Sequence, residues 1–343
     1  MKKILAIVAA AVFGTALLTA GGPVPPQSLL NIPCSKLSAA VSPSTFFGTP
    51  ITERDAAAQT IRETHELPED DAIRQVGGLT CEWSNGLPTT GKGGWLGVRL
   101  ELLPAGETSF RAWADAWGFT GTAVLSCDGS LLPWVCTYDG LVDGDWLSMR
   151  AVGVAGSIAG HELLRGLRDA VQLAGPSGAP VWTPPAGSVR LPRTCDAIVP
   201  GSFVDTAFSP RFPVETYLDL FGSSVRSGAR SRVGAVVCAW LVDGADIASM
   251  ITLPGGAWAW PEARPLLTRP GALRPLSIPS LRPGDEAYLR CDASRQDCFV
   301  DLIVGGNWIS LHAGPDFVGR MYRADRGDAL TAIARQIVGL MYS

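Results

Sequence analysis

The alternation of apolar and polar residues along the chain predicts strands interleaved with a few amphipathic helices. Residues 95–102 alternate regularly between apolar and polar side chains, which is the pattern of a strand with one buried face. Residues 236–242 are apolar on both faces and therefore predict a strand inside a sheet. Apolar side chains recur every three to four residues in 109–117, 164–171 and 330–340, which predicts three amphipathic helices.

A set of cysteine and tryptophan positions occurs twice in the same order. In both copies a tryptophan follows the second cysteine by two residues and another follows the fourth by ten. The surrounding pattern in each copy runs helix, two strands, helix, three strands, helix. This order predicts an α+β fold of two homologous modules, each a disulfide-stapled antiparallel sheet with helices mainly on one face. The matched positions are Cys34 with Cys195, Cys81 with Cys238, Trp83 with Trp240, Cys127 with Cys291, Cys136 with Cys298, and Trp146 with Trp308.

The composition between the copies sets the domain boundaries. Residues 34–175 form the first predicted repeat and residues 190–343 the second. Proline and glycine are frequent in 176–189, which is typical of a linker. Residues 22–33 are also rich in proline and predict an extended, mobile tether. Residues 1–21 are expected to be a signal peptide.

The N-terminal residues carry the features of secretion. Lys2 and Lys3 precede an apolar run, residues 4–18, that is short for a membrane-spanning helix. The tripeptide before Gly21 matches the one that precedes the acylated cysteine of bacterial lipoproteins, but glycine offers no thiol to a lipid. Contact with a membrane would therefore require an uncleaved N-terminal anchor or a natural cysteine at position 21.

Charge and cysteine content limit the partners and the compartment. The 28 basic and 32 acidic residues give a net charge of −4, and no polybasic cluster is present, so nucleic acid and anionic membrane surfaces are poor partners. Eight cysteines in a chain with a predicted signal peptide indicate a disulfide framework and an extracytoplasmic location. The repeat favours joining the first cysteine of each copy to its second and the third to its fourth. An alternative that joins the first cysteine of each copy to its third or fourth stays open. The favoured pairs are Cys34 with Cys81, Cys127 with Cys136, Cys195 with Cys238 and Cys291 with Cys298.

Catalytic and cofactor motifs are not found in the sequence. It contains no Gly-x-Ser-x-Gly, no His-Glu-x-x-His, no P-loop and no dinucleotide fingerprint. No Cys-x-x-Cys pair is present to suggest a zinc site. We therefore expect no catalytic residues, cofactor or metal. A glycosidase-like pair of carboxylates stays open, because such residues need not be close in sequence.

The strand that begins at the last tryptophan of each copy carries the candidate binding residues. With a period of two, one face presents a tryptophan, a serine and a basic side chain. An aromatic ring beside a hydroxyl and a basic group suits stacking on a sugar or contact with a partner protein. Alternatively, each tryptophan packs under a covering loop and its polar neighbours are solvated. The two triplets are Trp146, Ser148 and Arg150, and Trp308, Ser310 and His312.

One family resemblance follows from these motifs. The Cys-x-x-Leu/Ile starts at Cys34 and Cys195, the Cys-x-Trp strands at Cys81 and Cys238, and the near-lipobox before Gly21 resemble actinobacterial cell-envelope lipoproteins that contain domains of unknown function. The resemblance covers both copies and implies an envelope-exposed α+β module. It supplies no activity and no site residues, and Gly21 departs from the lipid-anchored pattern.

These observations predict a secreted or cell-envelope binding protein without catalytic activity. The expected ligand is an envelope glycan or another envelope component, in keeping with the 11 tryptophans. One alternative is a tandem-domain inhibitor or scaffold that docks on another secreted protein. A further alternative is an envelope polysaccharide hydrolase.

Overall fold

Two antiparallel sheets, of six and seven strands, organise the part of the chain that the computed structural model describes. The predicted signal peptide lies outside this part. We call residues 24–175 the N-terminal half and residues 190–343 the C-terminal half. The described residues are 24–56, 58–59, 69–88, 94–130, 133–210, 212–218, 224–267, 273–292, 297–314 and 324–343.

The N-terminal half contains a sheet with the strand order β1-β2-β3-β6-β5-β4. All of its neighbouring strands run antiparallel. Its elements are α1 (Cys34–Val41), the 3-10 turn η1 (Pro43–Phe46), β1 (Thr52–Arg54), α3 (Glu69–Gln75), β2 (Leu79–Ser84), β3 (Gly97–Leu103), α4 (Glu107–Ala116), β4 (Ala123–Asp128), β5 (Val135–Val142), β6 (Asp145–Val152) and α5 (Ser157–Gln172).

The C-terminal half contains a sheet with the strand order β10-β11-β12-β13-β9-β8-β7. Read from β7, this order matches the first sheet strand for strand, so that β11 is the counterpart of β4. Strand β10 is an additional strand at the edge beyond β11. Its elements are α6 (Cys195–Ile198), α7 (Gly201–Phe208), β7 (Glu215–Leu218), α8 (Val225–Val233), β8 (Val237–Val242), β9 (Ala245–Leu253), η2 (Gly256–Ala259), α9 (Trp260–Ala263), η3 (Arg264–Leu267), β10 (Arg274–Pro275), β11 (Glu286–Asp292), β12 (Asp297–Val304), β13 (Asn307–Ala313) and α10 (Arg326–Tyr342).

Short Asp-Gly turns fix the register of two hairpins. Asp143 and Gly144 join β5 to β6, and Asp243 and Gly244 join β8 to β9. All four residues have positive φ, 52° and 88° in the first turn and 52° and 75° in the second. Two consecutive residues in the left-handed region form the turn whose twist matches that of paired strands, and Asp-Gly favours it.

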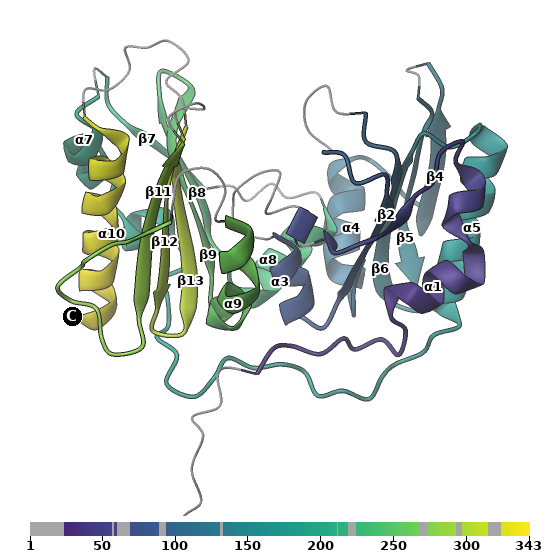
Figure 1. Cartoon of the computed structure of the whole chain (residues 1–343), viewed down its shortest axis with the longest axis horizontal. Coiled ribbons are helices and arrows are strands. Elements are labelled where there is room, and N and C mark those ends of the chain that lie inside the picture. Colours follow the sequence, from purple (N-terminus) through teal and green to yellow (C-terminus); the bar gives the residue numbers. More distant parts are fainter. Residues whose placement is uncertain are drawn as a thin grey trace, which may run out of the picture.

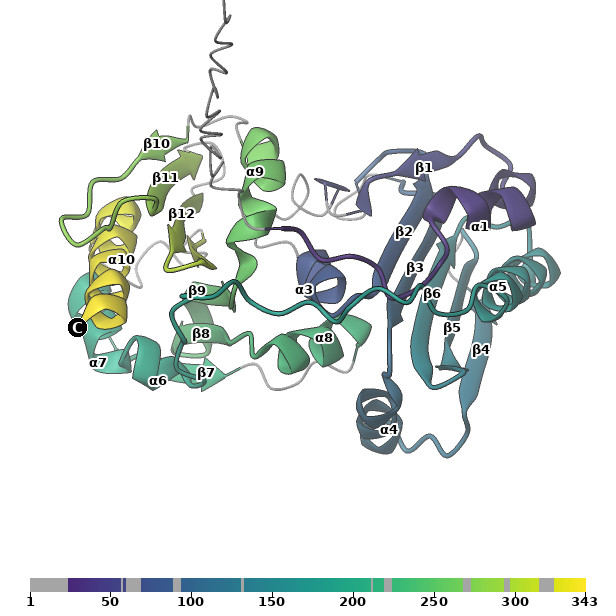
Figure 2. The same ribbon diagram turned by 90° about the horizontal axis from the view of Figure 1, so that it is seen from below.

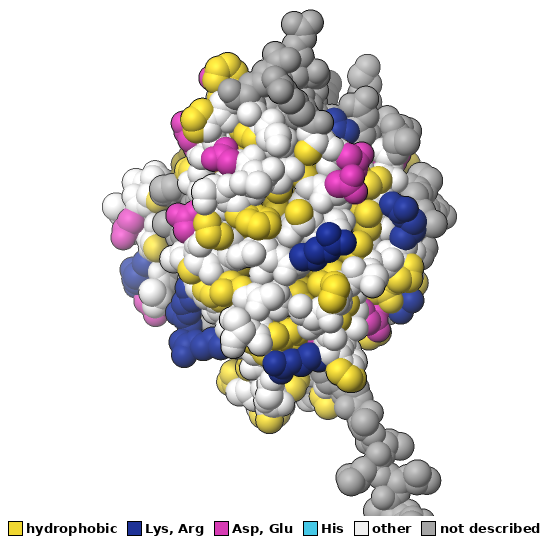
Figure 3. Space-filling model, turned by 90° about the vertical axis from the view of Figure 1, so that its left-hand side faces the viewer, with side chains coloured by type: hydrophobic (Ala, Val, Ile, Leu, Met, Phe, Trp, Pro, Cys, Tyr) yellow, Lys and Arg dark blue, Asp and Glu magenta, His cyan; other side chains and the backbone are white. Residues whose placement is uncertain are grey.

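Helices lie on both faces of the sheets. Helix α5 buries Leu163, Leu164 and Leu167 against the outer face of the first sheet, and α10 covers the outer face of the second (Figure 1). Figure 3 shows the outer side of the C-terminal half, where apolar side chains lie in separate groups among uncharged and charged ones. Helices α3, α4, α8 and α9 lie between the two sheets (Figures 1 and 2). The expectation of helices mainly on one face therefore misses the inner layer, which α4 joins because Phe110 packs on Trp146.

The four predicted disulfides are confirmed. Two of them tie the first helix of each half to the Cys-x-Trp strand, and two join residues directly opposite each other on neighbouring strands. They are consistent with an extracytoplasmic protein. Among the described residues, no helix is both long enough and apolar enough to cross a bilayer. The bonds are Cys34–Cys81, Cys195–Cys238, Cys127–Cys136 and Cys291–Cys298.

The proline-rich segment before α1 is extended, and the hydrogen bonds that it forms hold it in place. The amide of Leu29 donates to the Gly77 carbonyl oxygen at 2.7 Å, and the amide of Ser177 donates to the Leu29 carbonyl oxygen at 2.8 Å. The Trp182 indole donates to the Val24 carbonyl oxygen at 3.1 Å. Residues 24–33 therefore lie along the linker.

The two halves contact each other through equivalent surfaces. Helix α3 packs against its counterpart α8. The Gln75 side chain at the end of α3 donates to the Pro254 carbonyl oxygen at 2.6 Å, and Arg232 at the end of α8 donates to the Pro104 carbonyl oxygen. Gln75 and Arg232 each lie six residues before a Cys-x-Trp cysteine, and each proline directly follows the next strand. Such reciprocal use of one surface is the geometry of a two-fold dimer.

Candidate functional site

The structure places the two tryptophans that were predicted to stack on a ligand inside the molecule. Trp146 and Trp308 are each 1% exposed. Neither ring has a face free for a sugar, so the stacking role does not fit this arrangement. Both belong to one apolar cluster that spans the halves, called here the inner cluster. It includes Ile73, Leu103, Phe110 and Trp146 of the N-terminal half and Val225, Leu253, Trp260 and Trp308 of the C-terminal half.

Each buried tryptophan meets an aromatic ring from an inner helix that lies earlier in the same half. The rings of Trp146 and Phe110 are 5.9 Å apart at 74°, and those of Trp308 and Trp260 are 5.4 Å apart at 73°. Edge-to-face contacts of this kind add to the free energy of burying the rings. The repeated tryptophans therefore hold the inner helices on the sheets, in place of the covering loops that were considered.

The serines that follow the tryptophans lie beside carboxylates, one half-buried and one buried. Ser148 is opposite Asp139 in the β5–β6 register, and Ser310 is opposite Asp301 in β12–β13. The Trp308 indole donates to Asp301 Oδ1 at 3.2 Å. Burial raises the pKa of Asp139 to about 6, although its contacts with Ser148 and Trp146 favour the charged form.

The basic ends of the two triplets differ. Arg150 is exposed, whereas the His312 side chain is 25% exposed and stacks on Phe299 with ring centres 4.4 Å apart. His312 Nε2 lies 3.4 Å from Asp297 Oδ1, but burial outweighs that carboxylate and lowers the His312 pKa. His312 is therefore neutral near pH 7. The six predicted binding residues do not form one accessible site.

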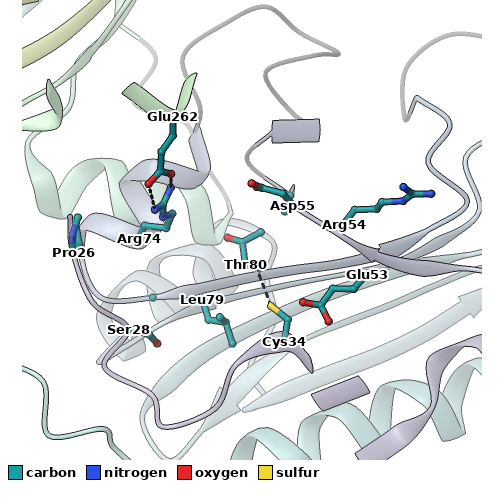
Figure 4. A pocket seen from close by; sticks show the side chains of 12 residues that line it. Pro26, Ser28, Cys34, Glu53, Arg54, Asp55, Arg74, Leu79, Thr80 and Glu262 are labelled. Carbon is teal, nitrogen blue, oxygen red and sulfur yellow. Dashed lines mark hydrogen bonds and ion pairs between the residues drawn. The ribbon is translucent and has the colours of Figure 1, made fainter. Parts of the chain in front are cut away.

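A pocket of about 520 Å³ with both polar and apolar lining opens where the two halves meet (Figure 4). Its walls come from the N-terminal segment, α1, β1, α3 and β2 of the N-terminal half and from α9 of the C-terminal half. We call it the junction pocket. It is lined by Pro26, Ser28, Cys34, Glu53, Arg54, Asp55, Ala56, Arg74, Gly78, Leu79, Thr80 and Glu262.

An ion pair between the halves forms one wall of the junction pocket. Arg74 Nη1 donates to Glu262 Oε2 at 2.9 Å and to Asp71 Oδ1 at 3.0 Å. The Arg74 guanidinium also lies over the Trp258 ring, 4.8 Å from its centre. Burial disfavours the charged form of Arg74, but the carboxylates of Glu262, Asp71 and Asp55 together outweigh burial and raise its pKa. This arginine is therefore held charged, and its charge is matched inside the wall.

The opposite wall presents carboxylates. Figure 4 shows Glu53 and Asp55 at the end of β1 and the Arg54 guanidinium directed away from them. Asp55 Oδ1 accepts the Ala58 amide at 3.0 Å. The Thr80 hydroxyl is buried and has no hydrogen-bond partner among the described residues. This wall therefore offers hydrogen-bond acceptors and carries more negative than positive charge.

Sequence reasoning missed the junction pocket. Arg74 and Glu262 are 188 positions apart, and no motif links them. The pocket exists because α9 docks beside α3, so its residues are brought together by the packing of the halves. The only local signal was the charged triplet Glu53-Arg54-Asp55 after a proline-bearing turn, which is typical of many solvated loops.

Neither a metal-binding cluster nor a similar protein points to further residues of the site. Within the described ranges, no group of three or more histidine, cysteine, aspartate or glutamate side chains could hold a metal ion. Searches against protein-family models, curated proteins and solved structures gave no match for the chain.

Proposed function

We propose that this chain is a secreted or cell-envelope binding protein without catalytic activity, and that it takes a polar ligand in the junction pocket. The ligand class that fits best is a short glycan rich in hydroxyl groups. The observation that carries the proposal is the acceptor-rich wall of a 520 Å³ pocket built from both halves. The resemblance to actinobacterial envelope lipoproteins supports the same compartment.

The size and polarity of the pocket support a small polar ligand. Pockets of about 300–1,000 Å³ hold small molecules, with a few placed polar groups that fix their orientation. Sugar hydroxyls donate strong hydrogen bonds to carboxylates such as Glu53 and Asp55. The Arg74 charge is matched by Glu262 and Asp71, so the wall disfavours an anionic ligand.

We further propose that the two halves are homologous modules joined by duplication. Their strand orders correspond, their disulfides occupy equivalent positions, and their contacts are reciprocal. One interface therefore builds a pocket that neither half contains alone. The duplication then serves to build the junction pocket, because α3 of one half supplies a wall residue and α9 of the other supplies its ion-pair partner.

Binding can be tested with the secreted chain on a glycan array, followed by calorimetry with the strongest oligosaccharide. Asp55→Asn combined with Glu53→Gln removes two negative charges and keeps the Asp55 acceptor for the Ala58 amide. We expect at least about a tenfold loss of affinity, since each charge-assisted bond contributes about 1.5–3 kcal/mol. Glu162→Gln, on the exposed outer side of α5, is the matched control and should bind like the parent.

Two outcomes would favour the alternatives. One stoichiometric protein partner in a pull-down, with no signal on the glycan array, would favour an inhibitor or scaffold. Release of reducing ends from an envelope polysaccharide would favour a hydrolase. Equal binding by the parent and the double variant would place the ligand outside the junction pocket.

A further inference from the structure

Strand β4 forms an outer edge of the N-terminal sheet, whereas its counterpart in the C-terminal sheet is covered. In the second half, β10 pairs antiparallel with β11 through Arg274 and Pro275. The Leu276 amide extends this pairing with a bond to the Ala287 carbonyl oxygen at 2.8 Å. Among the described residues, β4 pairs only with β5 (Figure 2). The same position of the same sheet thus accepts an additional antiparallel strand in one half of this chain.

The hydrogen-bonding phase of β4 shows which backbone groups point outward. Cys127 and Cys136 are opposite each other with Cα atoms 4.1 Å apart, which is the spacing of a non-hydrogen-bonded pair. The Leu141 amide donates to the Thr122 carbonyl oxygen at 2.9 Å, which fits the same phase. The odd-numbered residues of β4 therefore direct their N–H and C=O groups away from β5. These residues are Ala123, Leu125 and Cys127.

The other sheet edges carry features that discourage pairing, and β4 does not. Strand β1 has three residues, including Glu53 and Arg54, and β10 has two, Arg274 and Pro275. Strand β7 has four residues. Short length, charge and proline are the usual protections of an edge. Strand β4 has six residues, none of them proline, and its one charged residue is the last, Asp128.

We propose that β4 pairs antiparallel with β4 of a second copy of this chain, which makes one continuous sheet across two molecules. Pairing about Leu125 sets outward-directed residues of both copies opposite each other, as a ladder requires. Each Asp128 then faces Thr122 of the other copy, so like charges do not meet. A two-fold contact of this kind closes as a dimer.

Exposed apolar surface beside β4 supports this occupant. Helix α5 packs on β4, and Ile158 in its first turn is 74% exposed. The Ser157 carbonyl oxygen lies 3.6 Å from Cys127 Sγ, which places this helix start at the edge of the sheet. The two α5 helices of a dimer would lie on the same face of the joined sheet, where Ile158 would lose contact with water.

The test is sedimentation velocity of the full chain over a wide range of concentrations. Ala123→Pro removes an outward N–H without breaking a bond to β5, and proline is tolerated at the first residue of an edge strand. Ala123→Thr keeps the N–H and is the matched control. We expect a concentration-dependent dimer for the parent and the threonine variant, and a monomer for the proline variant at concentrations where the parent is dimeric.

Hydrogen exchange keeps the test decisive if the proline variant folds poorly. The outward-directed amides of Ala123, Leu125 and Cys127 in the parent should gain protection as its concentration rises. A parent that stays monomeric at every concentration would overturn the proposal. So would a dimer whose β4 amides gain no protection, or one that persists in a folded Ala123→Pro chain, because either would place the contact elsewhere. None of these outcomes bears on ligand binding in the junction pocket.

Discussion

At the scale of single residues, one position shows how the inner faces of the sheets differ. Asp139 and Asp301 occupy equivalent register positions beside Ser148 and Ser310. Asp301 accepts the Trp308 indole at 3.2 Å and lies 3.6 Å from Arg290. Among the described residues, Asp139 forms no ion pair with an arginine, and burial raises its pKa to about 6. The charged form of Asp139 is therefore disfavoured in the folded protein.

The pH dependence of stability follows from this shift. The folded protein holds the Asp139 proton more tightly than an unfolded chain whose pKa is 3.8, so the stabilisation by that proton is complete below pH 3.8 and is lost by about pH 6. Asp139→Asn should raise the unfolding free energy at pH 7.5 by about 1–2 kcal/mol and leave it unchanged at pH 3. Thermal unfolding at both pH values measures this. Asp115→Asn, on the exposed side of α4, is the control, and an equal gain there would contradict the assignment to Asp139.

At the scale of elements, local sequence predicts most of the fold within each half. The Asp-Gly turn at Asp143, the alternation in 95–102 and the repeated cysteines lead to the observed hairpins, strands and disulfides. Gly160 shows a detail that no period reveals: a Cβ at this position would lie 2.1 Å from Cys136 Sγ, so α5 can approach the disulfide only with glycine there. Strands β1 and β7 were missed because runs of three or four residues carry too little periodicity.

The disulfides should differ in their contribution to stability because they close loops of different length. Cys34–Cys81 spans 47 residues and Cys127–Cys136 spans 9. Replacing both cysteines of a pair by serine should lower the unfolding free energy by about 4 kcal/mol for the first pair and about 2.5 kcal/mol for the second, from loop-closure entropy. Urea unfolding of the two double variants measures the difference. Equal losses would mean that each disulfide stabilises the protein mainly through contacts in the folded state, and not by restricting the unfolded chain.

At the scale of the whole molecule, the packing of the halves could not be predicted from the sequence. The apolar periods of α4 and of the strand that begins at Trp146 show that a face is buried, but not what buries it. In the structure this face joins the inner cluster with Trp308 and Leu253 from the other half. The burial of the predicted binding residues could not be foreseen for the same reason. The tryptophans that were expected to meet a ligand lie instead in the cluster between the halves, and the junction pocket is lined by other residues.

Separated halves should therefore reassociate. Fragments 24–178 and 179–343 each expose an apolar face centred on Trp146 or Trp308, and burial of such a face contributes about 25 cal/mol per Å². We expect each fragment alone to bind a hydrophobic dye or aggregate, and an equimolar mixture to form a 1:1 complex. Light scattering after size-exclusion chromatography measures the masses.

Gly228 of α8 offers a substitution that tests where the two fragments contact each other. A Cβ at Gly228 would lie 2.7 Å from Leu103 Cδ2 and 2.9 Å from Ser109 Cβ, both in the N-terminal half. Gly228→Leu should abolish the complex without harming the C-terminal fragment itself, because leucine favours a helix more than glycine does. Gly339→Leu in α10 is the matched control, since no atom lies within 4 Å of a Cβ there, and it should leave the complex intact. Two folded, monomeric fragments that ignore each other would contradict the reciprocal interface. A complex that tolerates Gly228→Leu would place the contact on another surface.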